Sequence, residues 1–102
     1  IARANIGAVY LYVKDYTRAL EHSLAALTIL KQQLGDSHPT TASVYIGLAE
    51  IYSDMNDLRN ALQYYEKALV IYEQNYSSDN GDLIDLKKSI GDVNKRLSQK
   101  LE

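Results

Sequence analysis

The side chains of this 102-residue sequence that could perform chemistry are few and far apart. The two histidines, His22 and His38, fall on different predicted elements, and neither has a second ligand at a metal-binding spacing such as His-x-x-x-His. Residues 54–58, Asp-Met-Asn-Asp-Leu, resemble part of a calcium loop but lack its glycine and its terminal glutamate. Cysteine is absent, which removes disulfides and thiolate metal sites. We therefore expect neither a metal nor another cofactor.

Motifs for catalysis and for binding to nucleic acid or membrane are also missing. The sequence contains no nucleophile elbow, no phosphate-binding loop and no paired-carboxylate pocket. Its formal net charge is −2, whereas a nucleic-acid-binding protein is expected to carry a basic excess or stripe. No apolar run approaches the ~18 residues of a membrane span, and no signal-peptide pattern is present at the start. These features predict a cytoplasmic protein that is not an enzyme.

The elements that would position any binding residues are arranged as a repeat. Identical residues recur 42 positions apart, which predicts a solenoid whose units bury their faces against one another. The identical pairs are Tyr10 and Tyr52, Asp15 and Asp57, Ala19 and Ala61, Leu20 and Leu62, Ala26 and Ala68, Leu27 and Leu69, Ile29 and Ile71, and Gln32 and Gln74. The chain begins at Ile1, inside a helical pattern, so we also expect it to be part of a longer protein.

Helical spacing of the apolar residues predicts five helices and no strand, which is an all-α fold. Asp15 and Asp57 stand where helix N-caps are needed, and Gly35 stands where a helix should stop. Pro39 suits a first helical turn, because its missing N–H would have no partner there. The expected helices cover residues 2–14, 16–34, 39–54, 58–75 and 82–100. We expect them to stack as an α-solenoid of antiparallel helix pairs.

The last predicted helix differs from the others, because a single apolar stripe runs along an otherwise charged surface. The stripe consists of Leu83, Leu86, Ile90, Val93 and Leu97. The end of a solenoid needs such a polar outer face, so this segment is either a capping helix or the start of a third repeat. Lys88 with Asp92, and Asp92 with Arg96, are spaced to form stabilising (i, i+4) ion pairs that require no partner.

Within each unit, the spacing of large and small residues resembles the tetratricopeptide repeat. The residues that carry the resemblance are Ile6, Gly7, Tyr10, Tyr16, Ala19 and Ala26 in the first unit, and Tyr45, Leu48, Ala49, Tyr52, Ala61, Tyr65 and Ala68 in the second. Gly91 continues the register, although Asn94 replaces the expected Tyr. We expect Gly7, Ala49 and Gly91 to let neighbouring helices approach closely. HEAT and armadillo repeats reach a similar length, but the paired small residues favour the tetratricopeptide family.

The 42-residue period is longer than the usual 34 residues of this family, and this longer form resembles the repeats of kinesin light chains. The resemblance implies one domain over 1–102, with repeats at 1–41 and 42–83 and a third, partial or capping element at 84–102. It also implies a non-catalytic scaffold that binds a peptide or helix of a partner protein in a concave groove. The alternatives are a self-association or spacer module, or a regulatory segment of a larger multidomain protein.

In this family the first helix of each unit lines the groove, so the resemblance implies the binding positions by register. The implied groove residues are Asn5, Ala8, Tyr12, Ile46, Glu50, Ser53, Asp54, Lys88, Asp92 and Lys95. Glu50 and Asp54 place like charges on one helix face, which mildly destabilises a lone helix. We therefore regard this pair as the better candidate for contact with a partner.

Two specialisations of the family can be compared with these positions. Chaperone-docking members use a clamp of Lys, Asn and Arg. This clamp is missing here, because the matching positions are Ala4, Ala8, Gly47, Asp85 and Ser89. Kinesin light chains hold the peptide backbone with an Asn in the first helices, which Asn5 matches but Gly47 and Ser89 do not. The identity of the partner is thus not predicted by the resemblance.

Overall fold

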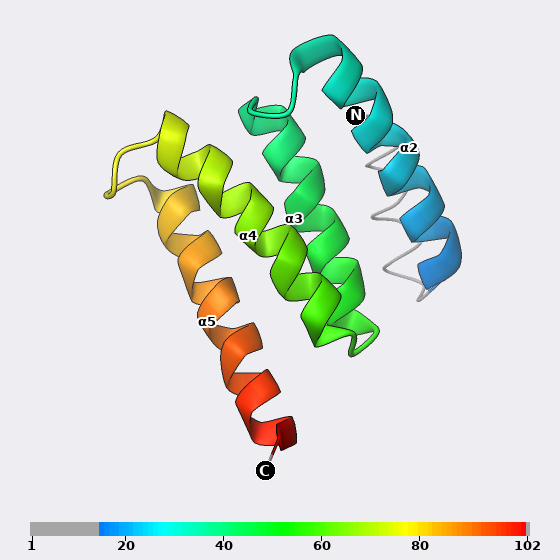
Figure 1. The fold of residues 1–102 in the computed structure, drawn as a ribbon, viewed down its shortest axis with the longest axis vertical. Helices are drawn as coiled ribbons and strands as arrows, with labels where there is room; N and C mark the ends of the chain where they lie inside the picture. Colours follow the sequence, from blue (N-terminus) through cyan, green and yellow to red (C-terminus); the bar gives the residue numbers. More distant parts are fainter. Residues whose placement is uncertain (1–14, 102) are drawn as a thin grey trace.

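The computed structural model describes residues 15–101, and this part of the chain forms four α-helices and no strand. The helices are α2 (Tyr16–Leu34), α3 (Pro39–Asp54), α4 (Leu58–Asn75) and α5 (Gly81–Leu101) (Figure 1). The last four predicted helices are therefore confirmed. The predicted first helix, over residues 2–14, lies outside the described residues.

The helices begin where short polar side chains supply the missing hydrogen-bond acceptors. Asp15 Oδ1 accepts a hydrogen bond from the backbone N–H of Arg18 at 3.3 Å, and Asp57 Oδ1 accepts one from the N–H of Asn60 at 3.4 Å. His38 caps α3 in the same way, because its Nδ1 accepts from the N–H of residue 40 at 3.1 Å. Helix α5 is capped by the side-chain oxygen of Asn80. The predicted aspartate caps are confirmed.

Two connections need left-handed backbone. Gly35 ends α2 with a φ of 89°, a conformation that glycine adopts without steric cost. Asn56, in the short turn between α3 and α4, has a φ of 67°, and asparagine is among the few other residues that tolerate this region. Pro39 is the first residue of α3, as predicted.

The helices form a thin layer. Helix α2 packs against α3, α3 against α4, and α4 against α5. Successive helices run in opposite directions, so α3 and α5 are parallel to each other (Figure 1). The Cα atoms extend over 43 × 35 × 18 Å, which describes stacked hairpins rather than a closed bundle. This arrangement confirms the predicted all-helical, tetratricopeptide-like architecture.

The core is built from small residues where helices meet and from tyrosine rings between α3 and α4. Ala19, Ala49 and Ala61 are completely buried, as the predicted close helix contacts require. The ring of Tyr64 stacks against that of Tyr52 at a centroid distance of 5.6 Å and against that of Tyr45 at 6.0 Å. Stacked rings add to the stabilisation that burial of their apolar surface provides.

The prediction for Gly91 is wrong in this structure. Gly91 is exposed, and a Cβ atom added to it would meet no other atom within 4 Å. Its register mate Ala49 is fully buried in α3, which lies between α2 and α4. Helix α5 packs mainly against α4, so within residues 15–101 no second helix covers the face that carries Gly91.

The predicted ion pairs along α5 are also wrong. Within the described range 15–101, Lys88 and Asp92 form no ion pair, and neither do Asp92 and Arg96. The Arg96 guanidinium bonds to α3 instead, where several acceptors lie together. A multiple contact of this kind is favoured over one exposed (i, i+4) pair, which contributes only a few tenths of a kcal/mol.

The apolar stripe of α5 faces α4, as predicted. Leu83, Leu86 and Val93 are buried, while Ile90 and Leu97 are partly buried against the same core. The helix continues through residues 97–99, which are in register with the turn at 55–57. Residue 99 is Gln, which lacks the short carboxylate that caps the corresponding helix at Asp57. The interpretation as a capping helix is consistent with this continuity and remains a prediction.

Candidate functional site

A cavity of about 240 Å³ opens between α3 and α5, with α4 behind it. Helix α3 contributes residues one helical turn apart, α5 contributes residues from its first three turns, and α4 contributes a single tyrosine. The lining residues are Ile46, Glu50, Tyr72, Asp82, Asp85, Leu86 and Ser89. This is the place where three elements of the described chain converge on one concave surface.

The cavity combines an apolar interior with an acidic rim. Leu86 and Tyr72 are only 3% and 7% exposed, and Ile46 is half-buried beside them. The Tyr72 ring is held in place edge-on against the Tyr76 ring, with a centroid distance of 5.0 Å. Glu50 stands at the opening of the cavity on the α3 side. The cavity therefore offers apolar contacts in its interior and negative charge at its rim.

The acidic groups of the rim have different environments. Burial by the surrounding protein raises the pKa of Glu50 above its usual value, although its side chain still reaches the surface. Asp82 lies in the first turn of α5, where the helix dipole favours a negative charge. Among residues 15–101, no lysine or arginine forms an ion pair with Glu50, Asp82 or Asp85. The rim therefore carries carboxylates that the described chain does not neutralise by direct contact.

Tyr65 lies seven residues before Tyr72 on the same face of α4, and it extends the floor of the cavity. Its side chain is buried, and burial is the main cause that raises its pKa, followed by the nearby charge of Glu50. A hydrogen bond with Ser89 acts in the opposite direction. These interactions place the Tyr65 hydroxyl between α3 and α5, beside the cavity.

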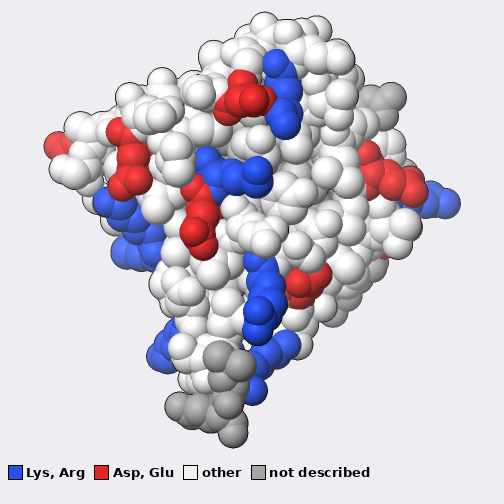
Figure 2. Space-filling model, in the orientation of Figure 1, with Lys and Arg blue, Asp and Glu red and all other residues white. Residues whose placement is uncertain are grey.

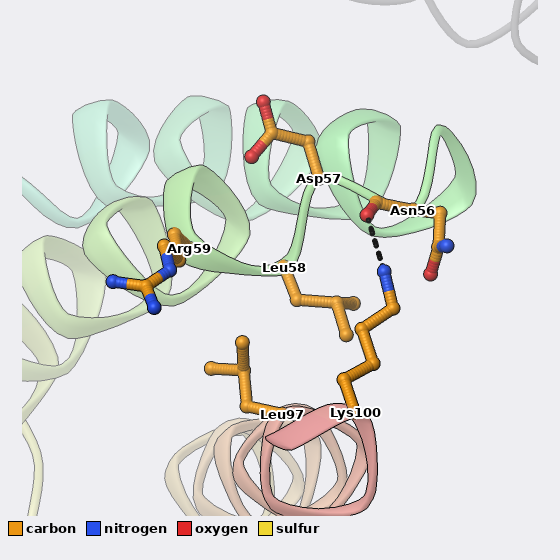
Figure 3. A pocket seen from close by; sticks show the side chains of 6 residues that line it. All are labelled: Asn56, Asp57, Leu58, Arg59, Leu97 and Lys100. Carbon is orange, nitrogen blue, oxygen red and sulfur yellow. Dashed lines mark hydrogen bonds between the residues drawn. The ribbon is translucent and has the colours of Figure 1, made fainter. Parts of the chain in front are cut away.

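The other end of α3 is occupied by cations from α5. Arg96 Nη1 donates to Ser53 Oγ at 2.8 Å, and Nη2 donates to the Ser53 carbonyl and to Asn56 Oδ1, both at 3.4 Å. Lys100 Nζ donates to the Asn56 carbonyl at 3.4 Å (Figure 3). The last carbonyls of a helix have no intrahelical partner and carry partial negative charge, so these cations satisfy the C-terminal end of α3.

Asp54 is also engaged, but by the preceding helix. Its Oδ2 accepts a hydrogen bond from the Tyr16 hydroxyl at 2.5 Å. This hydrogen bond is the largest cause of the raised pKa of Tyr16. Asp54 therefore connects α3 to α2, and it is already bonded within the chain.

A second hollow, of about 250 Å³, lies at the end of α5 near the turn between α3 and α4 (Figure 3). Leu58 and Leu97 face each other across it, Lys100 crosses toward the turn, and Asp57 points away. The lining residues are Asn56, Asp57, Leu58, Arg59, Leu97 and Lys100. Because its main polar contacts are made within the chain, this hollow is a junction between helices and a weaker candidate for a binding site.

The residues predicted for the groove fall into three groups. Asn5, Ala8 and Tyr12 lie outside the described residues. Ile46 and Glu50 line the cavity, whereas Ser53 and Asp54 make the contacts within the chain described above. Lys88, Asp92 and Lys95 are exposed on α5 and do not line the cavity. The groove assignment as a whole stays a prediction.

The predicted groove residues omit five of the seven residues that line the cavity, one of which is Ser89, next to the predicted Lys88. Asp82, Asp85 and Leu86 lie nearer the start of α5 than the predicted positions, and Tyr72 belongs to the second helix of its unit. The spacing of Tyr65 and Tyr72, seven residues apart on one helix face, is the signal that could have indicated the floor.

Comparison with known proteins agrees with this architecture. The sequence model of the family described as "Tetratricopeptide repeat" matches residues 1–74. This chain belongs to the tetratricopeptide repeat family. Members of this family generally mediate protein–protein interactions and are generally not catalysts.

Proteins similar to this chain are found in Arabidopsis thaliana. Protein KINESIN LIGHT CHAIN-RELATED 1 is 39% identical over 70 residues, which are 69% of this chain and 12% of that protein. Protein KINESIN LIGHT CHAIN-RELATED 3 is 41% identical over 69 residues, covering 68% of this chain and 11% of that protein. The tetratricopeptide segment thus matches only about a tenth of the length of these relatives.

The described part of this tetratricopeptide protein shows two further properties. None of its four helices has both the length and the apolar content needed to cross a membrane. Within residues 15–101, no three His, Cys, Asp or Glu side chains are grouped in a way that could hold a metal ion. Acidic and basic side chains are interspersed on the face shown in Figure 2, without a continuous field of one sign.

Proposed function

We propose that this tetratricopeptide segment binds an extended peptide or a helix of a partner protein in the groove between α3 and α5. The observation that carries the proposal is the cavity lined by both helices, in which buried apolar surface lies directly below polar groups. Peptide-binding surfaces need both features, since apolar burial provides affinity and convergent polar groups fix orientation. The relatives named for kinesin light chains support the same proposal and, with it, a cytoplasmic location.

Peptide display on the complete 102-residue chain tests this function. Selected peptides should bind the unchanged chain and lose affinity when Glu50→Arg adds charge and bulk at the cavity. Glu66→Arg is the matched control, because Glu66 is exposed on α4 and does not line this cavity. Circular dichroism should show equal helix content in both variants. Peptides that bind both variants as tightly as the unchanged chain would contradict the proposed groove.

Self-association is a second candidate function, favoured by exposed apolar residues on α2. Leu24, Ile29 and Leu34 are 39%, 42% and 43% exposed, and a second copy could cover them. Light scattering should then show a mass that rises with concentration and returns to the monomer value in Ile29→Glu. A constant monomer mass at high concentration would remove this candidate. A regulatory role within a larger protein is a further proposal, supported by the small share of the relatives that this chain matches.

A further inference from the structure

The chemistry of the cavity is more specific than a general peptide groove. Its volume of about 240 Å³ lies below the ~300–1,000 Å³ of typical small-molecule sites, so it suits a single long side chain. Glu50, Asp82 and Asp85 approach it from two helices, and within residues 15–101 none of the three is neutralised by an ion pair. An occupant with an apolar stem and a positively charged end would match both parts of the cavity.

Tyr72 provides a second, independent indication of a ligand. Its side chain is 7% exposed and lines the cavity, yet its hydroxyl forms no hydrogen bond with any described residue. The hydroxyl is not among the fully enclosed, unpartnered polar atoms of the described chain, so it remains accessible at the surface of this part of the molecule. Buried tyrosine hydroxyls usually have a hydrogen-bond partner, and a donor group entering the cavity would supply one.

We infer that this cavity accepts the cationic side chain of a Lys or Arg residue in the partner peptide, with Arg preferred. The methylene stem would pack on Ile46 and Leu86 while the charged end reaches the carboxylates of α3 and α5. Arg is preferred because its planar guanidinium can donate to more than one carboxylate and to the Tyr72 hydroxyl at once. The inference rests on the proposed function, since it names the chemistry of the peptide that the groove would hold.

Nuclear magnetic resonance titration of the 102-residue chain with short blocked peptides tests the inference. The probes are acetyl-Ala-Arg-Ala-amide and its analogues with citrulline, leucine or glutamate in place of Arg. Citrulline keeps the shape of Arg but has no charge. We expect saturable shifts at the amides of Glu50, Asp85 and Ser89 with the Arg peptide, and binding about fivefold weaker with citrulline. Added salt should weaken the binding of the Arg peptide and leave the binding of the citrulline peptide nearly unchanged.

Protein variants provide the second arm of the test. The double variant Glu50→Gln with Asp85→Asn keeps side-chain size and should bring the Arg peptide to the affinity of the citrulline peptide. Glu21→Gln with Glu66→Gln makes the same charge change at exposed positions away from the cavity and should have no effect. Tyr72→Phe should cause a smaller loss, because it removes only the hydroxyl. Circular dichroism checks that each variant remains helical.

Several outcomes would overturn the inference. Equal shifts with the Arg and citrulline peptides, stronger shifts with the Glu peptide, or shifts that map to other residues would each do so, as would no saturable shift with the Arg peptide. The proposed function fails separately, because it requires only that display-selected peptides lose affinity in Glu50→Arg. Selected peptides that bind the groove without Lys or Arg would retain the function and reject the cationic subsite.

Discussion

The α2–α3 junction and the α3–α5 junction use side chains that are one repeat apart, yet their polar contacts are built from opposite charges. At the first junction Asp54, near the end of α3, accepts a hydrogen bond from Tyr16 of α2. The register mate of Asp54 is Arg96 of α5, which donates to Ser53 and Asn56 at the end of α3. Asp54 thus contacts α2, the second helix of the preceding unit, whereas Arg96 contacts the end of α3, the first helix of the preceding unit.

The cores of the two repeats do not differ in this way. Ala19 and Ala61 are identical and completely buried, and Ala26 and Ala68 are identical and almost completely buried. Close helix packing admits only small side chains at these points, whereas an exposed position admits any side chain that finds a partner. The comparison teaches that the repeat register determines the packing of this protein, while the polar contacts are particular to each junction.

The largest expected effect is on the shared core. Ala61→Leu should destabilise the chain by about 1–3 kcal/mol, because the added methylenes cannot fit a completely buried contact. Ala19→Leu should behave alike, since the two positions are equivalent. Urea unfolding followed by circular dichroism measures both, with Ala25→Leu at a partly exposed position as the control. A loss confined to one repeat would show that the cores are not equivalent.

The next effect concerns register mates with different surroundings. Gly91→Ala should stabilise the chain by about 0.5–1 kcal/mol, because Ala is the better helix former and its methyl group meets open space. Ala49→Gly should destabilise it by at least about 1 kcal/mol, since buried contact and helix propensity are both lost. The free energy of unfolding in urea checks both. Destabilisation by Gly91→Ala would mean that another element covers that face of α5.

The two junctions themselves are tested by removing their polar contacts. Arg96→Ala should cost about 0.5–1 kcal/mol, because it removes several charged hydrogen bonds that are exposed to solvent. Tyr16→Phe removes one exposed hydrogen bond to Asp54 and should have a smaller effect. Amide hydrogen exchange should show faster opening of α5 in the first variant and of α2 in the second. The same pattern in both variants would contradict separate roles for the junctions.

The smallest effect is the pH dependence of stability that Glu50 of α3 contributes beside the cavity. Burial raises the pKa of Glu50 in the folded chain above its ordinary value. At a pH between the unfolded and the folded pKa, the folded chain therefore retains a proton that the unfolded chain has released. The resulting destabilisation of the folded chain is absent at a pH below the pKa of Glu50 in the unfolded chain. It grows as the pH rises from that pKa to the pKa in the folded chain. Relative to the unchanged chain, Glu50→Gln should therefore be more stable at about pH 7 than at about pH 4. Urea unfolding at both pH values tests this, and a relative gain at the lower pH would contradict it.

Most of the fold could be predicted from local chemistry. The boundaries of α2, α3 and α4 followed from Asp15, Gly35, Pro39 and Asp57, because caps and breakers act on neighbouring backbone. Buried alanines could be located for a similar reason, since packing imposes residue size at fixed register. The environment of Gly91 could not, because it depends on whether another helix packs beside α5.

Less of the candidate site could be predicted. The family register identifies residues of the first helices, so it found Ile46 and Glu50 but could not reveal that Tyr72 of a second helix forms the floor. The hydrogen-bond partners of long side chains are harder still to predict. Arg96, for example, bonds to acceptors that come within its reach only after the helices have packed. The three predicted residues before position 15 are untested by the described part of the chain.

The thinness of the molecule has a consequence for the wall that α5 provides. In an array only 18 Å deep, each helix depends chiefly on its immediate neighbours, so a terminal segment can come away while the rest stays folded. Departure of α5 would split the acidic rim and leave Glu50, Ile46 and Tyr72 on an open surface. A ligand that contacts both α3 and α5 would therefore hold α5 against the other helices. Its binding free energy would include the cost of keeping α5 packed.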